Sequence, residues 1–84
     1  MNKIILKDGT EIEFKESDGL VLTIENTTVD EMEKLLTEEN LKNIKVSNGD
    51  IYGSYENLEL ISITKIIKSL NVIIRLKEPT NIAQ

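Results

Sequence analysis

Short runs of alternating apolar and polar residues dominate the first part of the chain, and they predict strands. Residues 4–6 and 12–14 are apolar or alternating, and they flank an Asp8-Gly9 pair. Such a pair is typical of a tight hairpin because both residues tolerate a positive φ. A polar turn at residues 16–19 follows, and residues 20–24 then alternate as in a half-buried strand. We therefore predict three strands in the first 24 residues.

The pattern changes to a helical period after residue 27. Thr28 and Glu31 have the spacing of a capping box, in which side chains satisfy the first free N–H groups of a helix. Apolar residues then recur at helical spacing, at Val29, Met32, Leu35 and Leu36. This predicts one short helix at about residues 28–37. Residues 37–40 repeat the capping chemistry, so we expect Leu41 in a separate helical turn, packed inward with Ile44.

Strand patterns return in the second half. Residues 44–46 and 51–55 flank an Asn48-Gly49 pair, the other common hairpin turn. Gly53 within this segment predicts a bulge or a close approach of another backbone. Residues 58–63 alternate, and residues 72–76 supply a last strand.

These elements predict an α+β, β-rich fold in the order β-β-β-α-β-β-β, with the short helix packed on a mainly antiparallel sheet. With 84 residues the chain has room for one core, so we expect a single domain over residues 1–84, with residues 78–84 as a frayed C-terminal tail. Residues 4–12 and 44–52 resemble each other, which fits either an internal duplication or the chance convergence of two common hairpins, and we favour convergence.

Composition narrows the classes of function. The net charge is −5, and residues 1–42 hold eleven acidic against five basic residues, which disfavours binding to nucleic acid. Cysteine is absent, and the first residues lack the apolar run of a signal peptide or a membrane span. We therefore expect neither export nor membrane insertion.

No catalytic machinery is recognisable. The chain has no histidine or cysteine, and its four glycines form no nucleotide-binding loop. The acidic pairs Glu11/Glu13 and Glu38/Glu39 are explained by an exposed strand and by a helix first turn, respectively. We predict no enzymatic activity, no catalytic or metal-ligating residues and no cofactor.

A protein interface is the remaining candidate site. Tyr52 and Tyr55 flank Gly53, and tyrosine is enriched at interface centres, although a half-buried sheet tyrosine is an alternative. If residues 58, 60, 72, 74 and 76 face the core, the opposite face still carries several of the remaining isoleucines, Ile61, Ile63, Ile66, Ile67 and Ile73. We predict that this protein binds another protein or a second copy of the chain through Tyr52, Tyr55, Ile61, Ile63 and Ile73, on the residue 52–55 hairpin and the outer face of residues 61–67 and 72–76.

Three segments carry a resemblance to a group of proteins. They are residues 6–10 (Leu-Lys-Asp-Gly-Thr), 36–41 (Leu-Thr-Glu-Glu-Asn-Leu) and 52–60 (Tyr-Gly-Ser-Tyr-Glu-Asn-Leu-Glu-Leu). Through them the chain resembles small prophage- and phage-encoded proteins of Gram-positive bacteria, of unassigned function and encoded near virion structural or lysis genes. The resemblance implies a non-enzymatic accessory protein that is a structural or assembly component, located in the bacterial cytoplasm or on the virion. The alternative is an acidic, anti-CRISPR-like inhibitor of a host defence nuclease.

Overall fold

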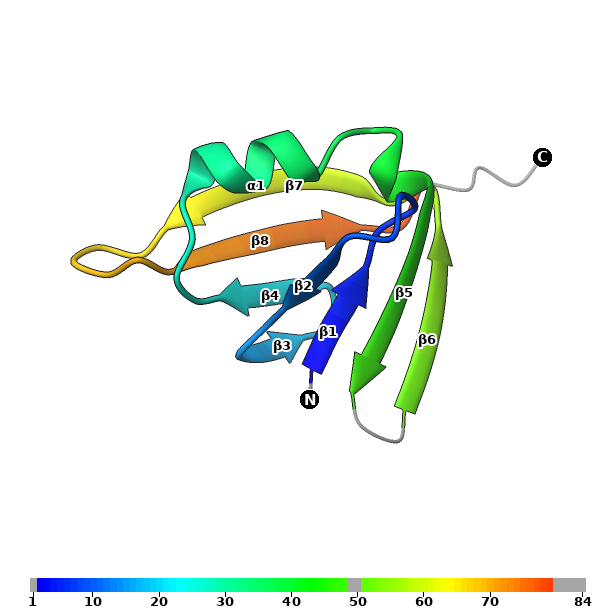
Figure 1. The fold of residues 1–84 in the computed structure, drawn as a ribbon, viewed down its shortest axis with the longest axis horizontal. Helices are drawn as coiled ribbons and strands as arrows, with labels where there is room; N and C mark the ends of the chain where they lie inside the picture. Colours follow the sequence, from blue (N-terminus) through cyan, green and yellow to red (C-terminus); the bar gives the residue numbers. More distant parts are fainter. Residues whose placement is uncertain (1, 49–50, 80–84) are drawn as a thin grey trace.

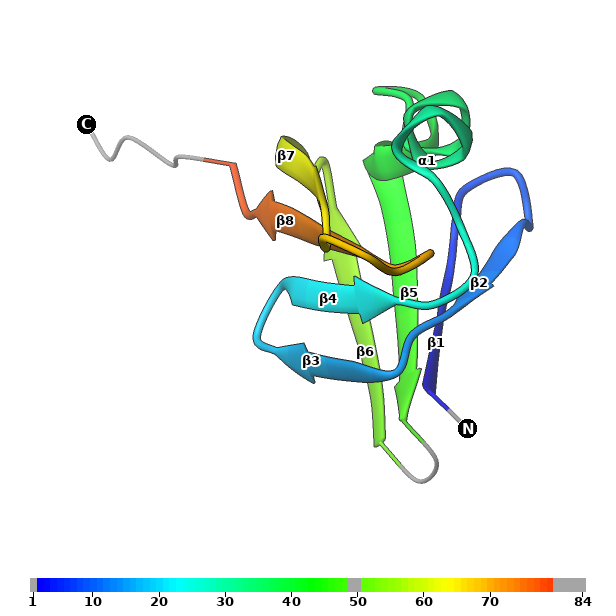
Figure 2. The same cartoon turned by 90° about the vertical axis from the view of Figure 1, so that its left-hand side faces the viewer.

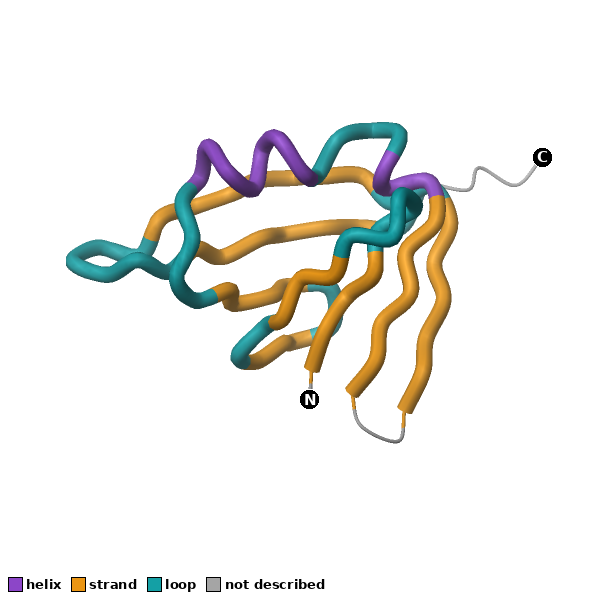
Figure 3. Tube along the Cα trace, in the orientation of Figure 1, coloured by secondary structure: helices purple, strands orange, loops and turns teal. Residues whose placement is uncertain are grey.

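The computed structural model describes residues 2–48 and 51–79, and strands make up most of them (Figure 3). Four strands precede the helix: β1 (Asn2–Ile5), β2 (Glu11–Glu13), β3 (Glu16–Asp18) and β4 (Val21–Ile24). Helix α1 (Val29–Leu35) and the 3-10 turn η1 (Asn40–Lys42) come next. Four strands follow: β5 (Asn43–Asn48), β6 (Ile51–Glu56), β7 (Glu59–Lys65) and β8 (Val72–Lys77).

The strands form two antiparallel sheets of four strands each, in the orders β2-β1-β5-β6 and β3-β4-β8-β7. The two sheets face each other with their strands crossing (Figures 1 and 2). Helix α1 runs along β7 above the opening between the sheets. The α+β, mainly antiparallel class predicted from the sequence is confirmed, but two sheets replace the expected single sheet.

Each half of the chain consists of two β-hairpins, the first in one sheet and the second in the other. The halves join at the centre of both sheets, where β1 pairs with β5 and β4 pairs with β8. The halves therefore have the same topology, and each sheet is shared equally between them. The described residues 2–48 and 51–79 form eight strands, where the predicted order has six.

Two corners carry the chain from one sheet to the other. At the first, the Phe14 N–H donates to Asn2 O of one sheet, and the Lys15 N–H donates to Thr23 O of the other (3.1 and 2.8 Å). At the second, Asn57 adopts a left-handed conformation (φ 55°) between β6 and β7. Strands that bend in this way let two crossed sheets share one core.

The two predicted hairpins are present, with a difference in the first turn. Residues Leu6–Thr10 connect β1 to β2, and only Gly9 among them has a positive φ (93°). The Asp8 carboxylate accepts the Thr10 N–H (2.9 Å). This hydrogen bond stabilises the turn without the second positive φ angle that the Asp-Gly pair predicted. In the second hairpin β5 and β6 pair from Asn48↔Ile51 onward. Residues 49–50 of the predicted Asn48-Gly49 turn lie outside the described residues.

The predicted helix and its cap are confirmed. The Glu31 N–H donates to Thr28 Oγ1 (3.2 Å), and the Thr28 hydroxyl lies 3.3 Å from the Glu31 carboxylate. The helix buries Met32, and Leu36 after its end is also buried. The second capping site is present as well, since the Asn40 N–H donates to Thr37 Oγ1 (3.2 Å) and Leu41 is buried.

One aliphatic core lies between the sheets. Its most deeply buried side chains are Ile4, Ile44, Val72 and Ile74, from the central strands of the two sheets. The least exposed residues thus come from the central strands, which belong to both halves of the chain. Both halves are therefore needed to enclose the core.

Two local predictions are wrong. Residues 16–18, expected in a turn, form strand β3, whose side chains are all exposed and which pairs with β4. Gly53 lies in a regular part of β6 opposite Val46, without a bulge, and the Tyr55 ring lies beside it. The predicted tail is described only in part: Glu78 and Pro79 are exposed after β8, and residues 80–84 lie outside the described residues.

Candidate functional site: the β7–β8 tip

The loop between β7 and β8 is a short, hydrogen-bonded turn that projects from the body of the molecule (Figure 1). We call residues 66–71 the β7–β8 tip. The Ile66 N–H donates to Asn71 O (3.0 Å), which continues the β7·β8 ladder into the loop. The Ser69 hydroxyl donates to Ile66 O (2.9 Å) and accepts the Asn71 N–H (3.2 Å). Lys68 adopts a left-handed conformation (φ 64°) that reverses the chain.

The tip is also fastened to the segment before α1. The Thr27 N–H donates to Leu70 O at 2.7 Å. These bonds hold the backbone of the loop in place.

Two large apolar side chains of the tip are exposed. Ile67 is 84% and Leu70 65% exposed, the two highest values among large apolar residues in the described chain. Turns usually carry polar residues because their backbone faces water. Apolar side chains displayed on a rigid turn are therefore a feature that core packing does not explain, and they are typical of a protein-binding surface.

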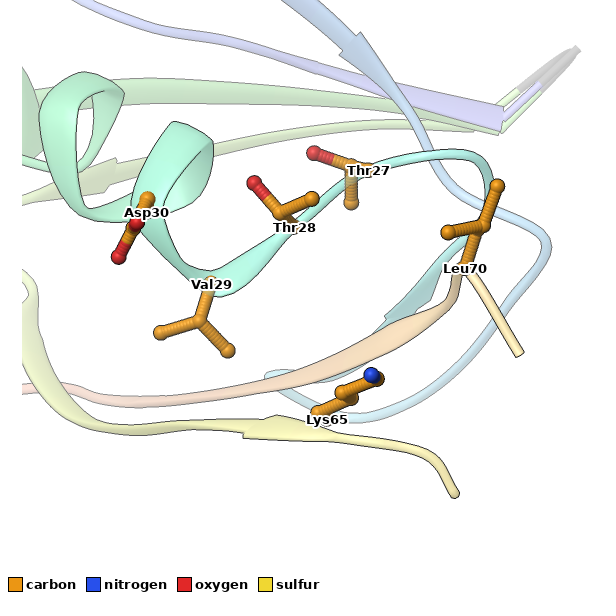
Figure 4. Close-up of a pocket in the computed structure, with 6 residues that line it drawn as sticks. All are labelled: Thr27, Thr28, Val29, Asp30, Lys65 and Leu70. Atoms are coloured by element: carbon orange, nitrogen blue, oxygen red, sulfur yellow. The ribbon is translucent and has the colours of Figure 1, made fainter. Parts of the chain in front are cut away.

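A small pocket adjoins the tip at the start of α1. Val29 and Lys65 lie on two sides of it, with Leu70 of the tip at one end (Figure 4). Its volume is about 230 Å³, below the range of roughly 300–1,000 Å³ that usually holds a small molecule. The pocket suits a single side chain of a protein partner better than a substrate.

Thr27 beside this pocket holds an unpartnered hydroxyl. The residue is 7% exposed, and its Oγ1 makes no hydrogen bond with any described residue. In Figure 4 this oxygen points away from Lys65 and Leu70. The hydroxyl therefore does not add a polar anchor to the side of the pocket that faces the tip.

Basic side chains flank the apolar ones. Lys65 and Lys68 are exposed, and neither forms an ion pair within the described ranges 2–48 and 51–79. Asp30 lines the far side of the pocket. The tip is thus a positively charged, partly apolar projection on a protein whose net charge is −5.

The structure describes the side chains of four of the five residues predicted as an interface, and these four do not all lie on one face. Tyr55 is half-buried opposite Ile44 and packs against the core, whereas Ile61 is 57% exposed. Ile73 is half-buried on the outer face of the second sheet, between Thr23 and Thr64. The backbone of Tyr52 pairs with Ser47, but its side chain lies outside the described residues.

Ile63 lies on the face opposite to the predicted one. The register of β7 shifts between Leu60, which pairs with Leu76, and Ser62, which pairs with Arg75. Ile61 is the extra residue of this bulge, so Ile63 pairs with Ile74 and packs against the core. A bulge reverses the alternation of side chains beyond it, and this is why the prediction failed.

Ile67 belongs to the predicted 61–67 segment, whereas Leu70 was not among the predicted site residues. A signal for Leu70 exists in the sequence, because residues 66–71 interrupt two strands with a turn that contains three apolar residues.

The acidic residues form no converging group. Among residues 2–48 and 51–79, no three acidic side chains are close enough together to hold a metal ion. Comparisons of the chain with protein-family models, with curated proteins and with solved structures gave no match. In the part of the chain that the structure describes, no helix has the length and apolar character to cross a membrane.

Proposed function

We propose that this protein is a non-enzymatic binding module that docks the β7–β8 tip into an apolar pocket of a partner protein. The observation that carries the proposal is the exposure of Ile67 and Leu70 on a turn held by its own hydrogen bonds. Lys65 and Lys68 beside them fit a partner pocket with an acidic rim. The resemblance to prophage proteins supports a role of this protein itself as a virion-associated structural or assembly component.

Cross-linking at the tip identifies the partner. A photoreactive residue at position 67, in cells that express the full chain, should capture one protein reproducibly. The same residue at position 61, which is also exposed, should not capture it. Mass spectrometry then names the partner, which can be purified for binding measurements.

Binding of the purified partner tests the proposal quantitatively. The variant Ile67→Asp with Leu70→Asp should bind at least about thirtyfold more weakly than the original chain, which corresponds to the loss of about 2 kcal/mol, the contribution of a single hot-spot residue. The control Ile61→Asp introduces the same charge at another exposed isoleucine and should bind normally. Equal affinities of all three proteins in calorimetry, with unchanged circular dichroism, would overturn the proposal.

The inhibitor of a defence nuclease is the second candidate, and one observation favours it. Glu11, Glu13, Glu16 and Asp18 are all exposed along the consecutive strands β2 and β3. Such an acidic edge could enter a basic nucleic-acid channel. The variant Glu13→Lys with Asp18→Lys would then lose binding, while the tip variant would retain it.

A further inference from the structure

The four edge strands of the two sheets differ in how they are protected from pairing with another chain. Strands β2 and β3 have only three residues each, and two of the three are acidic in both. Strand β7 carries the bulge at Ile61 and has α1 alongside it. Short length, charge, bulges and cover by a helix are the devices that keep an edge from adding a further strand.

Strand β6 has none of these devices. It spans six residues in a regular register with β5, without a bulge, and it contains no proline or lysine. Its only charged residue is Glu56, at its end. Among the described strands, only β5 pairs with it, and no ribbon runs beside its outer side in Figure 1.

The hydrogen bond that follows β6 shows which of its backbone groups face outward. The Asn57 N–H donates to Lys42 O (3.0 Å), on the β5 side. In an antiparallel ladder the N–H and C=O groups of successive residues point to alternate sides. Tyr55 and Gly53 therefore bond to β5, and the backbone groups of Glu56, Ser54 and Tyr52 point to the open edge.

We propose that two copies of this protein pair through β6 in an antiparallel arrangement, which joins their four-stranded sheets into one continuous sheet. With Ser54 at the two-fold axis, Ser54 faces Ser54 of the second copy, and Glu56 faces the backbone of Tyr52. All outward groups of these three residues then find partners. The strand is thus complementary to itself, which is the reason for assigning a second copy as its occupant.

Side chains also fit this register. Tyr55 of each copy lies opposite Gly53 of the other, which has no side chain that could clash across the contact, and the Tyr55 ring lies beside Gly53 of its own chain. The two Glu56 carboxylates lie at opposite ends of the pair, so no like charges face each other. The neighbour of Ser54 on strand β5 is Lys45, which is basic. It therefore adds no acidic charge near the centre of the contact.

The mass in solution tests this pairing. Sedimentation equilibrium and light scattering from about 10 μM to about 1 mM should show a reversible change from monomer to dimer. Ser54→Pro removes an outward N–H at the centre of the pair and leaves the β5·β6 bonds in place, so dimerisation should weaken at least tenfold. Ser54→Lys should have the same effect because it places two positive charges face to face.

Thr64→Lys is the matched control, since Thr64 is exposed on edge strand β7 and the charge change is the same. It should dimerise like the original chain, as should the tip variant Ile67→Asp with Leu70→Asp, because the tip and β6 are separate surfaces. Circular dichroism and melting curves show which variants are folded. The proposal is overturned if the original chain stays monomeric at 1 mM, even if its β6 edge binds other extended peptides. A folded Ser54→Lys variant that dimerises normally would also overturn it.

Discussion

Asn40 is a single buried amide that ties three elements together. Its side-chain Nδ2 donates to Asp8 of the first turn (3.2 Å) and to Leu35 O at the end of α1 (2.9 Å), while its backbone carbonyl accepts the Lys7 N–H (3.2 Å). Buried amides require such partners because an unsatisfied polar group is costly away from water. Asn40 therefore fixes the position of the β1–β2 turn against the helix.

Two carboxylates around Asn40 have lowered pKa values. Hydrogen bonds from the Thr10 N–H above all, together with Asn40, lower the pKa of Asp8. The ammonium groups of Lys7 and Lys42 lower the pKa of Glu39 by hydrogen bonding and charge attraction. Both groups are exposed, so water screens these interactions and each contributes only modestly to stability.

The lowered pKa values predict a dependence of stability on acid. A carboxylate whose pKa is lower in the folded than in the unfolded state stabilises the fold fully at a pH above its unfolded pKa, which is about 3.9 for Asp and 4.3 for Glu. This stabilisation is lost as the pH falls through the pKa of the folded state. We expect the free energy of unfolding, measured by urea titration, to fall from pH 5 toward pH 3 more steeply in the original chain than in Asp8→Asn with Glu39→Gln. Parallel pH profiles of the two proteins would contradict this assignment.

At the scale of elements, the bulge in β7 decides which isoleucines are buried. Without it, Ile61 and Ile63 would share one face, as the alternating pattern predicts. With it, Ile61 is exposed, and Ile63 faces Ile74 and the core. One unpaired residue thus separates two side chains that look equivalent in the sequence.

This difference gives a paired mutational prediction. Ile63→Asp should lower the free energy of unfolding by about 2–4 kcal/mol, because it places a charge against apolar neighbours. Ile61→Asp should change it by less than about 0.5 kcal/mol, as is usual for exposed positions. Chemical denaturation monitored by circular dichroism measures both. Equal losses of unfolding free energy in the two variants would show that the bulge does not place Ile61 and Ile63 in different surroundings.

At the scale of the whole molecule, the two halves depend on each other. Each half of the chain supplies one central strand to each sheet, and the pairs β1·β5 and β4·β8 hold the halves together. The least exposed residues lie on these strands. Neither half alone encloses a core, although both have the same strand order.

Fragments of the chain test this dependence. A peptide of residues 1–42 and one of residues 43–84 should each be unfolded by circular dichroism, because each sheet keeps only two of its four strands and an isolated pair of strands is marginal in water. Mixing the two peptides should restore β structure if the central pairings suffice to assemble the fold. A cooperative melting transition in either peptide alone would refute the expected dependence.

The features that the sequence by itself determined depend on residues close together in the chain. The capping box at Thr28 and Glu31, the turn at Asp8-Gly9 and the alternation in residues 20–24 each predicted an element that is present. A cap or a turn is a set of short-range hydrogen bonds, so a few residues contain all the information needed. The β-rich α+β class followed from these elements.

Pairing and packing decided the features that the alternating pattern does not show. Strand β3 is polar throughout and is a strand only because β4 offers it a ladder. The division into two sheets depends on the pairs β1·β5 and β4·β8, whose strands lie far apart in the chain, and the bulge that turns Ile63 inward is a feature of the β7·β8 pairing. Local alternation shows that a strand has two faces, but packing against the other sheet determines which face is buried.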